Sequence, residues 1–161
     1  MTAVESETPW FRVVNGTLYF EPTQYTGDPE LTVPEVVNGQ TVIRIGQQAF
    51  ENCTDLTTVI LPDTVLSIEY AAFGGCAALR GIFIPEGVTQ IDDHAFANCT
   101  ALEAISIPST AASIGDGTFD GCVKLNYIFY NGSYMTWKTL YPHKIQTKTQ
   151  VYCSDGAHLQ G

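Results

Sequence analysis

Five cysteines are the residues of this chain best able to do chemistry, and four of them are evenly spaced. Cys53, Cys76, Cys99 and Cys122 each follow the last by 23 residues, and Cys153 lies outside the series. Equal spacing predicts a ladder of parallel thiols about 5 Å apart, a geometry that fits neither tetrahedral zinc nor the dihedral angle of a disulfide. We therefore expect small, buried, unreactive thiols and no metal site.

Two other groups of polar residues could carry chemistry. Ser154, Asp155 and His158 have the residue types of a hydrolase triad, but they are neighbours in a terminal segment without a nucleophile elbow. The second group is a column of carboxylates, namely Glu69, Asp92, Asp93, Asp116 and Asp120. Such a column could bind Ca²⁺ but more often forms a solvated face, and the sequence leaves this open. We expect no enzyme, no catalytic residues and no cofactor.

The spacing of the cysteines belongs to a longer repeated line. Four copies align without a gap: IGQQAFENCTDLTTVILPDTVLS from Ile45, IEYAAFGGCAALRGIFIPEGVTQ from Ile68, IDDHAFANCTALEAISIPSTAAS from Ile91 and IGDGTFDGCVKLNYIFYNGSYMT from Ile114. A fixed period of this length is typical of a solenoid, in which each repeat buries its apolar face against its neighbours. We predict four 23-residue repeats over residues 45–130, within a single domain of residues 1–161.

Each repeat predicts two extended pieces and a compact turn. The pattern L-x-x-I-x-I-P, as in Leu56–Pro62, alternates like a strand with one buried face, and its proline ends the strand. The pattern V-x-x-I, as in Val65–Ile68, predicts a second short strand. The pattern I-x-x-x-A-F-x-x-C then predicts one or two helical or 3₁₀ turns on the convex side. The phenylalanines of this segment should form the spine of the core: Phe50, Phe73, Phe96 and Phe119.

The residue before each repeated cysteine is asparagine or glycine. These positions are Asn52, Gly75, Asn98 and Gly121. Because Asn and Gly accept a positive φ most easily, we predict left-handed backbone there in every coil. Two of these asparagines also begin N-glycosylation patterns, Asn-Cys-Thr, but the backbone requirement explains them without a glycan.

The two ends differ from the repeats and are predicted to cap the solenoid. Residues 8–44 should form a β-rich cap with turns at Asn15-Gly16 and Asn38-Gly39. Residues 131–161 should form the other cap, in which a short helix lays Trp137 over the last coil and residues 150–153 form a final strand.

Composition excludes several classes of partner. A hydrophobic content of 45% suits a buried core, and a net charge of −10 argues against nucleic acids and anionic membrane surfaces. No apolar run reaches transmembrane length, so we expect no membrane insertion. The first residues, MTAVESETPWF, do not resemble a signal peptide, which leaves open a cytoplasmic location or a mature or excised segment.

The line I-G-x-x-A-F-x-x-C-x-x-L-x-x-I-x-I-P closely resembles the BspA-like leucine-rich repeat of bacterial surface proteins, over about Ile45–Tyr130. The NGQTVIRIG, NGSYMTWKTL and VYCSDG segments resemble the caps of such proteins. The resemblance implies an α/β solenoid, a right-handed leucine-rich-repeat coil with parallel strands on the concave face. It also implies a secreted or cell-surface protein of the kind associated with adhesion to host matrix or other cells.

In leucine-rich repeats the outward residues of the parallel strands meet ligands. In this chain the predicted ligand-binding residues of the concave face are Ile60, Phe83, Ser106, Tyr127, Phe129 and Tyr152. Most of them are large and apolar, and a contiguous exposed stripe of that kind favours binding. β-Propensity, a neighbouring domain or a dimer mate could also account for the stripe.

Two functions of different classes follow from this reading. The first is a non-enzymatic binding and adhesion module that contacts a protein ligand or a host or cell-surface component through the concave face, with a homodimer through the apolar stripe as one form of contact. The alternative is a structural spacer or display domain of a larger secreted protein, with no ligand of its own.

Overall fold

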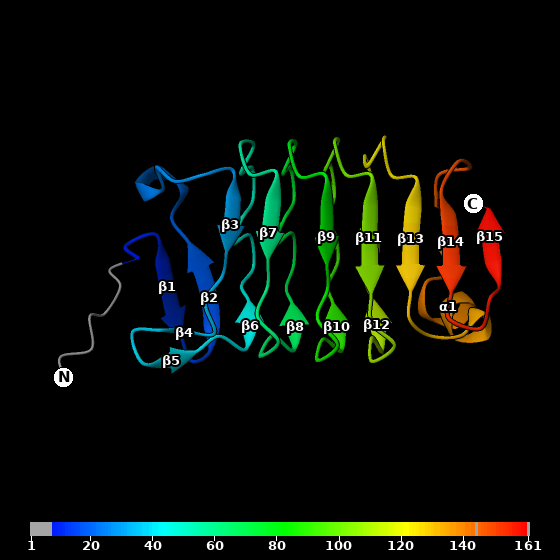
Figure 1. Ribbon diagram of the computed structural model, residues 1–161, viewed down its shortest axis with the longest axis horizontal. Helices are drawn as coiled ribbons and strands as arrows, with labels where there is room; N and C mark the ends of the chain where they lie inside the picture. Colours follow the sequence, from blue (N-terminus) through cyan, green and yellow to red (C-terminus); the bar gives the residue numbers. More distant parts are fainter. Residues whose placement is uncertain (1–7, 144, 161) are drawn as a thin grey trace.

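The computed structural model describes residues 8–143 and 145–160 and shows a right-handed solenoid (Figure 1). The chain advances along one long axis, and the first and last described residues lie near opposite ends. Each of the four repeats contributes one strand to a front row and one to a back row. The predicted fold class is therefore confirmed.

The front row is a seven-stranded sheet made of the four L-x-x-I-x-I segments and three further strands, one at the N-terminal end and two at the C-terminal end. Its order is β15 (His158–Gln160), β14 (Gln150–Cys153), β13 (Tyr127–Tyr130), β11 (Ala104–Ile107), β9 (Gly81–Phe83), β7 (Thr58–Ile60) and β3 (Glu30–Thr32). All pairs are parallel except β14 with β15. The parallel sheet thus extends beyond the four repeats into both predicted caps.

The back row is a six-stranded sheet built mainly from the V-x-x-I segments. Its order is β1 (Phe11–Val14), β2 (Thr17–Phe20), β6 (Arg44–Ile45), β8 (Ser67–Ile68), β10 (Gln90–Ile91) and β12 (Ser113–Ile114). Its isoleucines pair in register, Ile45 with Ile68 and Ile91 with both Ile68 and Ile114. All are buried, so this second sheet closes the core from the other side.

The β-rich N-terminal segment contains the two predicted hairpins. β1 and β2 are antiparallel about Asn15-Gly16, and β4 (Val36–Val37) pairs with β5 (Gln40–Thr41) about Asn38-Gly39. All four turn residues have positive φ, as a type I′ turn requires. A single 3₁₀ turn, η1 (Pro22–Gln24), follows the first hairpin.

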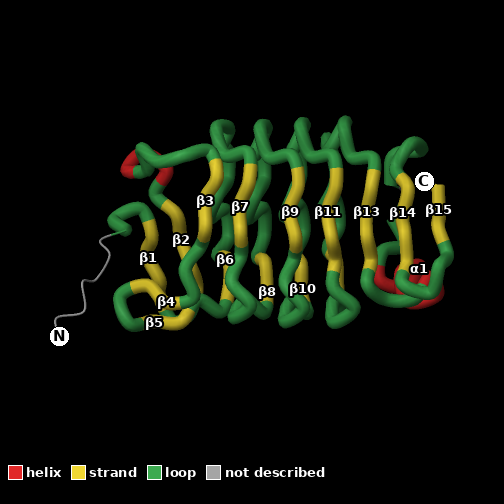
Figure 2. Tube along the Cα trace, in the orientation of Figure 1, coloured by secondary structure: helices red, strands yellow, loops and turns green. Residues whose placement is uncertain are grey.

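The convex segment between the two sheets differs in detail from the expected helical or 3₁₀ turns. The amides of Ala49 and Cys53 each donate to the carbonyl three residues earlier, at 3.0 and 3.1 Å, but these single turns do not continue into a helix. In the described residues helix occurs only at η1 and near the C-terminus (Figure 2). Left-handed residues separate the turns: the predicted Asn52 (φ 57°) and also Gln48 (φ 57°), which was not predicted.

The core contains the predicted ladder of phenylalanines. The rings of Phe50, Phe73 and Phe96 stack with centroids 5.0 and 5.3 Å apart and are almost parallel. Phe20 continues the stack at one end, 4.9 Å from Phe50. Because these three central rings are fully buried and in contact with one another, each coil is held to the next by aromatic packing as well as by hydrogen bonds.

The C-terminal segment closes the other end of the core. Ser133 caps α1 (Tyr134–Leu140) by accepting a hydrogen bond from the Thr136 amide at 3.2 Å. The helix buries Trp137, as predicted, against Tyr130 with ring centroids 5.4 Å apart. Strand β14 follows as predicted, whereas the antiparallel β15 was not predicted.

Candidate functional site

The cysteine ladder is part of the core rather than a reactive site. All five cysteines are free and buried. The thiol of Cys76 donates to the Phe50 carbonyl oxygen at 3.1 Å, and Cys99 makes the equivalent bond to Phe73 at 3.1 Å. Burial, with a smaller contribution from Asp55, raises the pKa of Cys53 to about 11, so its reactive thiolate is scarce at neutral pH. The structure gives Cys76, Cys99 and Cys122 a hydrogen-bonded packing role.

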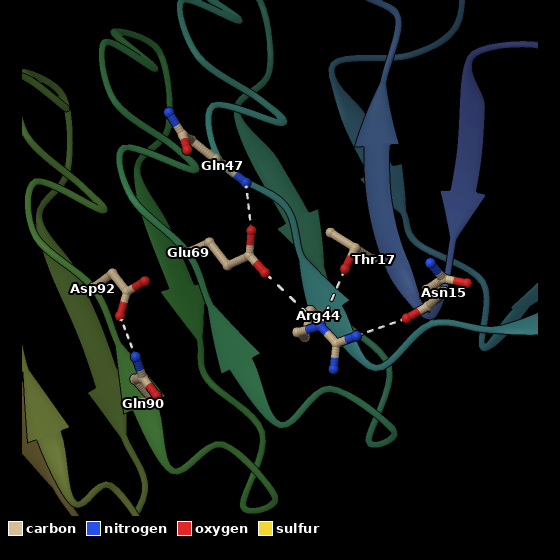
Figure 3. Close-up of polar contacts among 7 residues, drawn as sticks. All are labelled: Asn15, Thr17, Arg44, Gln47, Glu69, Gln90 and Asp92. Atoms are coloured by element: carbon tan, nitrogen blue, oxygen red, sulfur yellow. Dashed lines mark hydrogen bonds and ion pairs between the residues drawn. The ribbon is translucent and has the colours of Figure 1, made fainter.

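Carboxylates of the acidic column accept hydrogen bonds from backbone amides of neighbouring coils. The Glu69 carboxylate accepts a hydrogen bond from the Gln47 amide at 3.0 Å and lies 3.8 Å from the Arg44 Nε atom (Figure 3). Arg44 also donates to the Thr17 hydroxyl and the Asn15 carbonyl oxygen, at 3.1 and 2.6 Å. Glu69, in the second repeat, therefore contacts the first repeat at Gln47 and is linked through Arg44 to the N-terminal hairpin.

Three further carboxylates of the column also have partners, not all of which are backbone groups. Asp93 accepts from the Asp116 amide of the next coil at 2.8 Å, and Asp92 accepts from the Gln90 side chain at 2.6 Å (Figure 3). The Asp116 carboxylate lies 2.7 Å from the His143 Nε2 atom. No group of three or more His, Cys, Asp or Glu residues that could hold a metal ion occurs within the described part of the chain. These contacts account for much of the column through packing between coils.

The three residues with the types of a hydrolase triad, Ser154, Asp155 and His158, do not act together in the structure. Asp155 accepts hydrogen bonds from the amides of Tyr134 and Ala157, at 3.0 and 3.2 Å, and so fixes the turn before β15. His158 stacks on Tyr152, with ring centroids 5.9 Å apart. Neither contact activates Ser154.

The exposed face of the seven-stranded sheet carries the predicted ligand-binding residues in one band. Register places Ser106 beside Phe83 on one side and beside Phe129 on the other, and Phe129 beside Tyr152. Phe83 is 59% exposed, Ile60 55% and Phe129 45%, whereas Ser106 is half-buried. The strands alternate, so Val59, Ile82, Ile105, Ile128 and Val151 point inward and are buried.

Part of this band is a cluster of touching rings at the C-terminal end. Phe129 lies 5.8 Å from Tyr152 and 6.1 Å from Tyr127, measured between ring centroids. His158 extends the cluster beyond Tyr152. Sequence analysis did not place His158 on this face, because the short antiparallel strand that carries it lies outside the repeat pattern. Its two-residue spacing from Gln160 was the one visible sign of a strand.

Two hollows lie beside strands of the seven-stranded sheet. One, of about 180 Å³, adjoins Ile60 and Phe83 above Gly81. Another, of about 600 Å³, lies between α1 and the last strand and is lined by Trp137 and Leu159 among others. Only the first contains residues of the predicted binding face.

The repeat pattern matches a known family over most of the described chain. Residues 30–141 match the BspA type leucine-rich repeat region in six copies. The chain belongs to this family. The match extends beyond the four repeats predicted from the 23-residue spacing and includes β3 and α1, so the family's repeats continue into both predicted caps.

Solved structures of leucine-rich repeat proteins have the same fold. A protein from Bacteroides capillosus is 30% identical, with a TM-score of 0.65, over 76% of this chain and 93% of its own. A leucine-rich cell surface protein from Faecalibacterium prausnitzii is 28% identical, with a TM-score of 0.62, over 85% of this chain and 44% of its own. The chain therefore spans less than half of the length of that surface protein.

A more distant likeness shows the fold alone. The leucine-rich repeat protein of T. pallidum is 24% identical, with a TM-score of 0.58, over 78% of this chain and 71% of its own. No curated protein matches this chain. Within the described residues, no helix has the length and apolar character needed to cross a membrane.

Proposed function

We propose that this chain is a non-enzymatic binding module of a secreted or cell-surface bacterial protein and that it contacts protein ligands through the exposed face of the seven-stranded sheet. The observation that carries the proposal is the exposure of Ile60, Phe83, Phe129 and Tyr152 at equivalent strand positions, with Tyr127 beside Phe129 on β13. Large exposed apolar side chains lower solubility and add little to a core, whereas they are the side chains that dominate protein interfaces.

The family and its relatives support an extracellular setting. The similar protein from Faecalibacterium prausnitzii is described as a cell surface protein. The alternative function, a spacer or display domain without a ligand, is supported by the same relative, because this chain matches only 44% of it. The two functions differ in what they require of Phe83 and Phe129.

The test replaces both phenylalanines on the binding face. Phe83→Ser with Phe129→Ser should leave the fold intact and weaken binding to immobilised, purified host matrix proteins by at least about tenfold, because hot-spot aromatics carry most interface energy. Sedimentation of the same proteins measures self-association through the face. The matched control is Val123→Ser with Met135→Ser, two exposed apolar residues away from the sheet, which should bind as wild type does.

The spacer function predicts a different result. Wild-type protein that binds no matrix protein and sediments as a monomer, or a double variant that associates as wild type does, would contradict the proposed binding role.

A further inference from the structure

The band of aromatic side chains on the exposed sheet face is interrupted at Ser106. Strand β11 pairs with β9 and β13, and Ser106 is in register with Phe83 and Phe129. The two phenylalanines are therefore two strand spacings apart, about 10 Å. No ring in the described residues lies within stacking distance of Phe83. We name this interruption, bounded by Phe83, Ser106 and Phe129, the Ser106 gap.

The spacing of the gap suits one planar group. In the core of this molecule, rings on adjacent coils stack with centroids 5.0 and 5.3 Å apart, and on the exposed face Phe129 and Tyr152 lie 5.8 Å apart. A planar group above Ser106 would lie about 5 Å from the ring on each side. It would fill the position at which the row of aromatic side chains is interrupted. One of its faces would contact Phe83 and the other would contact Phe129.

One end of the gap carries an acidic group. The Asn131 side chain donates a hydrogen bond to the Glu86 carboxylate at 2.5 Å, which links the coil of β9 to that of β13 across β11. Asn131 directly follows β13, and Glu86 lies in the turn after β9, so this bridge lies at the ends of the two strands that carry Phe129 and Phe83. No Lys, Arg or His among the described residues forms an ion pair with Glu86.

The surroundings of Glu86 are also negatively charged. Asp63 occupies the turn position equivalent to Glu86 one coil earlier, and both residues are exposed. The whole chain has 17 acidic and 7 basic residues, a net charge of −10. A cationic partner segment is therefore attracted to this end of the face, whereas an acidic one is repelled.

From these observations we infer that the Ser106 gap binds an arginine side chain of a cationic partner protein, with the guanidinium stacked between Phe83 and Phe129 and directed toward Glu86. The guanidinium is planar, stacks on aromatic rings and donates to carboxylates. Lysine supplies the charge without the plane, and a neutral ring supplies the plane without the charge. The inference rests on the proposed function, because it names the chemistry of the ligand for the same face.

The test measures the gap directly, with a peptide in place of the full partner. Amide resonances of ¹⁵N-labelled protein are followed during titration with acetyl-Gly-Arg-Gly-amide, and with matched peptides that contain lysine, neutral citrulline or tyrosine. The arginine peptide should shift the resonances around Ser106 and bind at least about fivefold more tightly than each of the other three. Equal binding of the peptides, tighter binding of tyrosine, or shifts confined to other surfaces would overturn the inference.

Two variants and a control locate the binding. Ser106→Tyr fills the gap with a ring and should abolish the arginine-specific shifts, and Glu86→Gln should reduce the preference for arginine over citrulline. Thr32→Tyr adds the same side chain to the same face at the far end of the sheet, on β3, and should leave arginine binding unchanged. Arginine binding that survives Ser106→Tyr would refute the assignment.

The outcomes separate this inference from the proposed function. If the phenylalanine double variant loses matrix-protein binding but arginine binds no better than citrulline, the binding role stands and the ligand chemistry is wrong. If no matrix protein binds wild type but the arginine peptide selectively fills the gap, the ligand chemistry stands and the choice of partner is wrong.

Discussion

The convex turns and the exposed sheet face are built from the same 23-residue period, but they use their side chains differently. On the convex side, Glu69 and Asp93 each bind a backbone amide of an adjacent coil. On the sheet face, Phe83 projects 59% exposed and stacks on no other ring of the described chain. Folding accounts for the first set of side chains and leaves the second unexplained, which is why we propose a binding role for the sheet face.

The largest expected effect contrasts two phenylalanines of the same repeat. Phe73→Ala should lower the free energy of unfolding by about 3–5 kcal/mol, because it leaves a cavity between the rings of Phe50 and Phe96. Phe83→Ala should cost less than about 1 kcal/mol, because the side chain is mostly in solvent. Urea unfolding followed by circular dichroism measures both. Similar losses for the two variants would remove the distinction between the core ladder and the exposed band.

A smaller effect is expected at the convex turns. A Cβ atom at Gly75 would lie too close to the Asn52 side-chain oxygen, and the residue has a φ of 73°. Gly75→Ala should therefore cost about 2–3 kcal/mol, through strain and the clash together. Gly39→Ala is the control: its φ is 76°, but no atom lies within 4 Å of the added Cβ, so it should cost about 1 kcal/mol.

A second substitution separates the clash from the backbone strain. Asn52→Gly removes the obstructing side chain while keeping a residue that accepts its φ of 57°. The double variant with Gly75→Ala should be more stable than the sum of the single changes predicts, by about 1 kcal/mol. Strict additivity would show that adjacent coils do not pack through this pair.

The smallest expected effect is a change in the free energy of unfolding with pH. It tests whether the Cys53 thiol is packed in the core. Burial raises the pKa of Cys53 to about 11, above its ordinary value near 9. Between pH 9 and 11 the unfolded chain loses this proton while the folded chain keeps it, so the free energy of unfolding should fall as pH rises. Cys53→Ala should show a shallower fall in reducing buffer. An equal slope for both proteins would argue that Cys53 is accessible to solvent.

The repeated columns made much of the fold predictable. Spacing alone identified the buried rings of Phe50, Phe73 and Phe96, and the Asn or Gly before each cysteine identified left-handed backbone. These predictions succeeded because each depends on local chemistry, namely apolar periodicity and tolerance of positive φ. The Asn-Gly hairpins and the cap that contains Trp137 were predicted for the same reason.

What the sequence did not show depends on contacts between coils. Gln48, Ala71 and His94 also have positive φ, although glutamine and alanine do not favour it. Their amides donate to the carbonyl oxygens of Tyr70, Asp93 and Asp116 in the next coil, at 2.9, 3.1 and 2.9 Å. Such bonds hold each of these residues in its conformation, and a single repeat read alone contains no sign of them.

For the candidate site, the sequence predicted which side chains face outward but not which of them contact one another. Alternation identified the outward residues, and their exposure agrees with it at Ile60, Phe83 and Phe129. The bridge from Asn131 to Glu86 could not be read from the sequence, because it joins residues of different coils, and the stacking of His158 on Tyr152 depends on a hairpin outside the repeat pattern.

The orientation of the two sheets also determines how the molecule responds to tension. Its strands run across the long axis, so the hydrogen bonds between coils lie nearly along it (Figure 1). When the two ends are pulled apart, the force acts along these bonds, so the rows break one after another. A force across the bonds would instead load many of them together in shear. Each released coil of 23 residues yields up to about 80 Å of extended chain. Under tension the solenoid therefore behaves as a series of small extensible links.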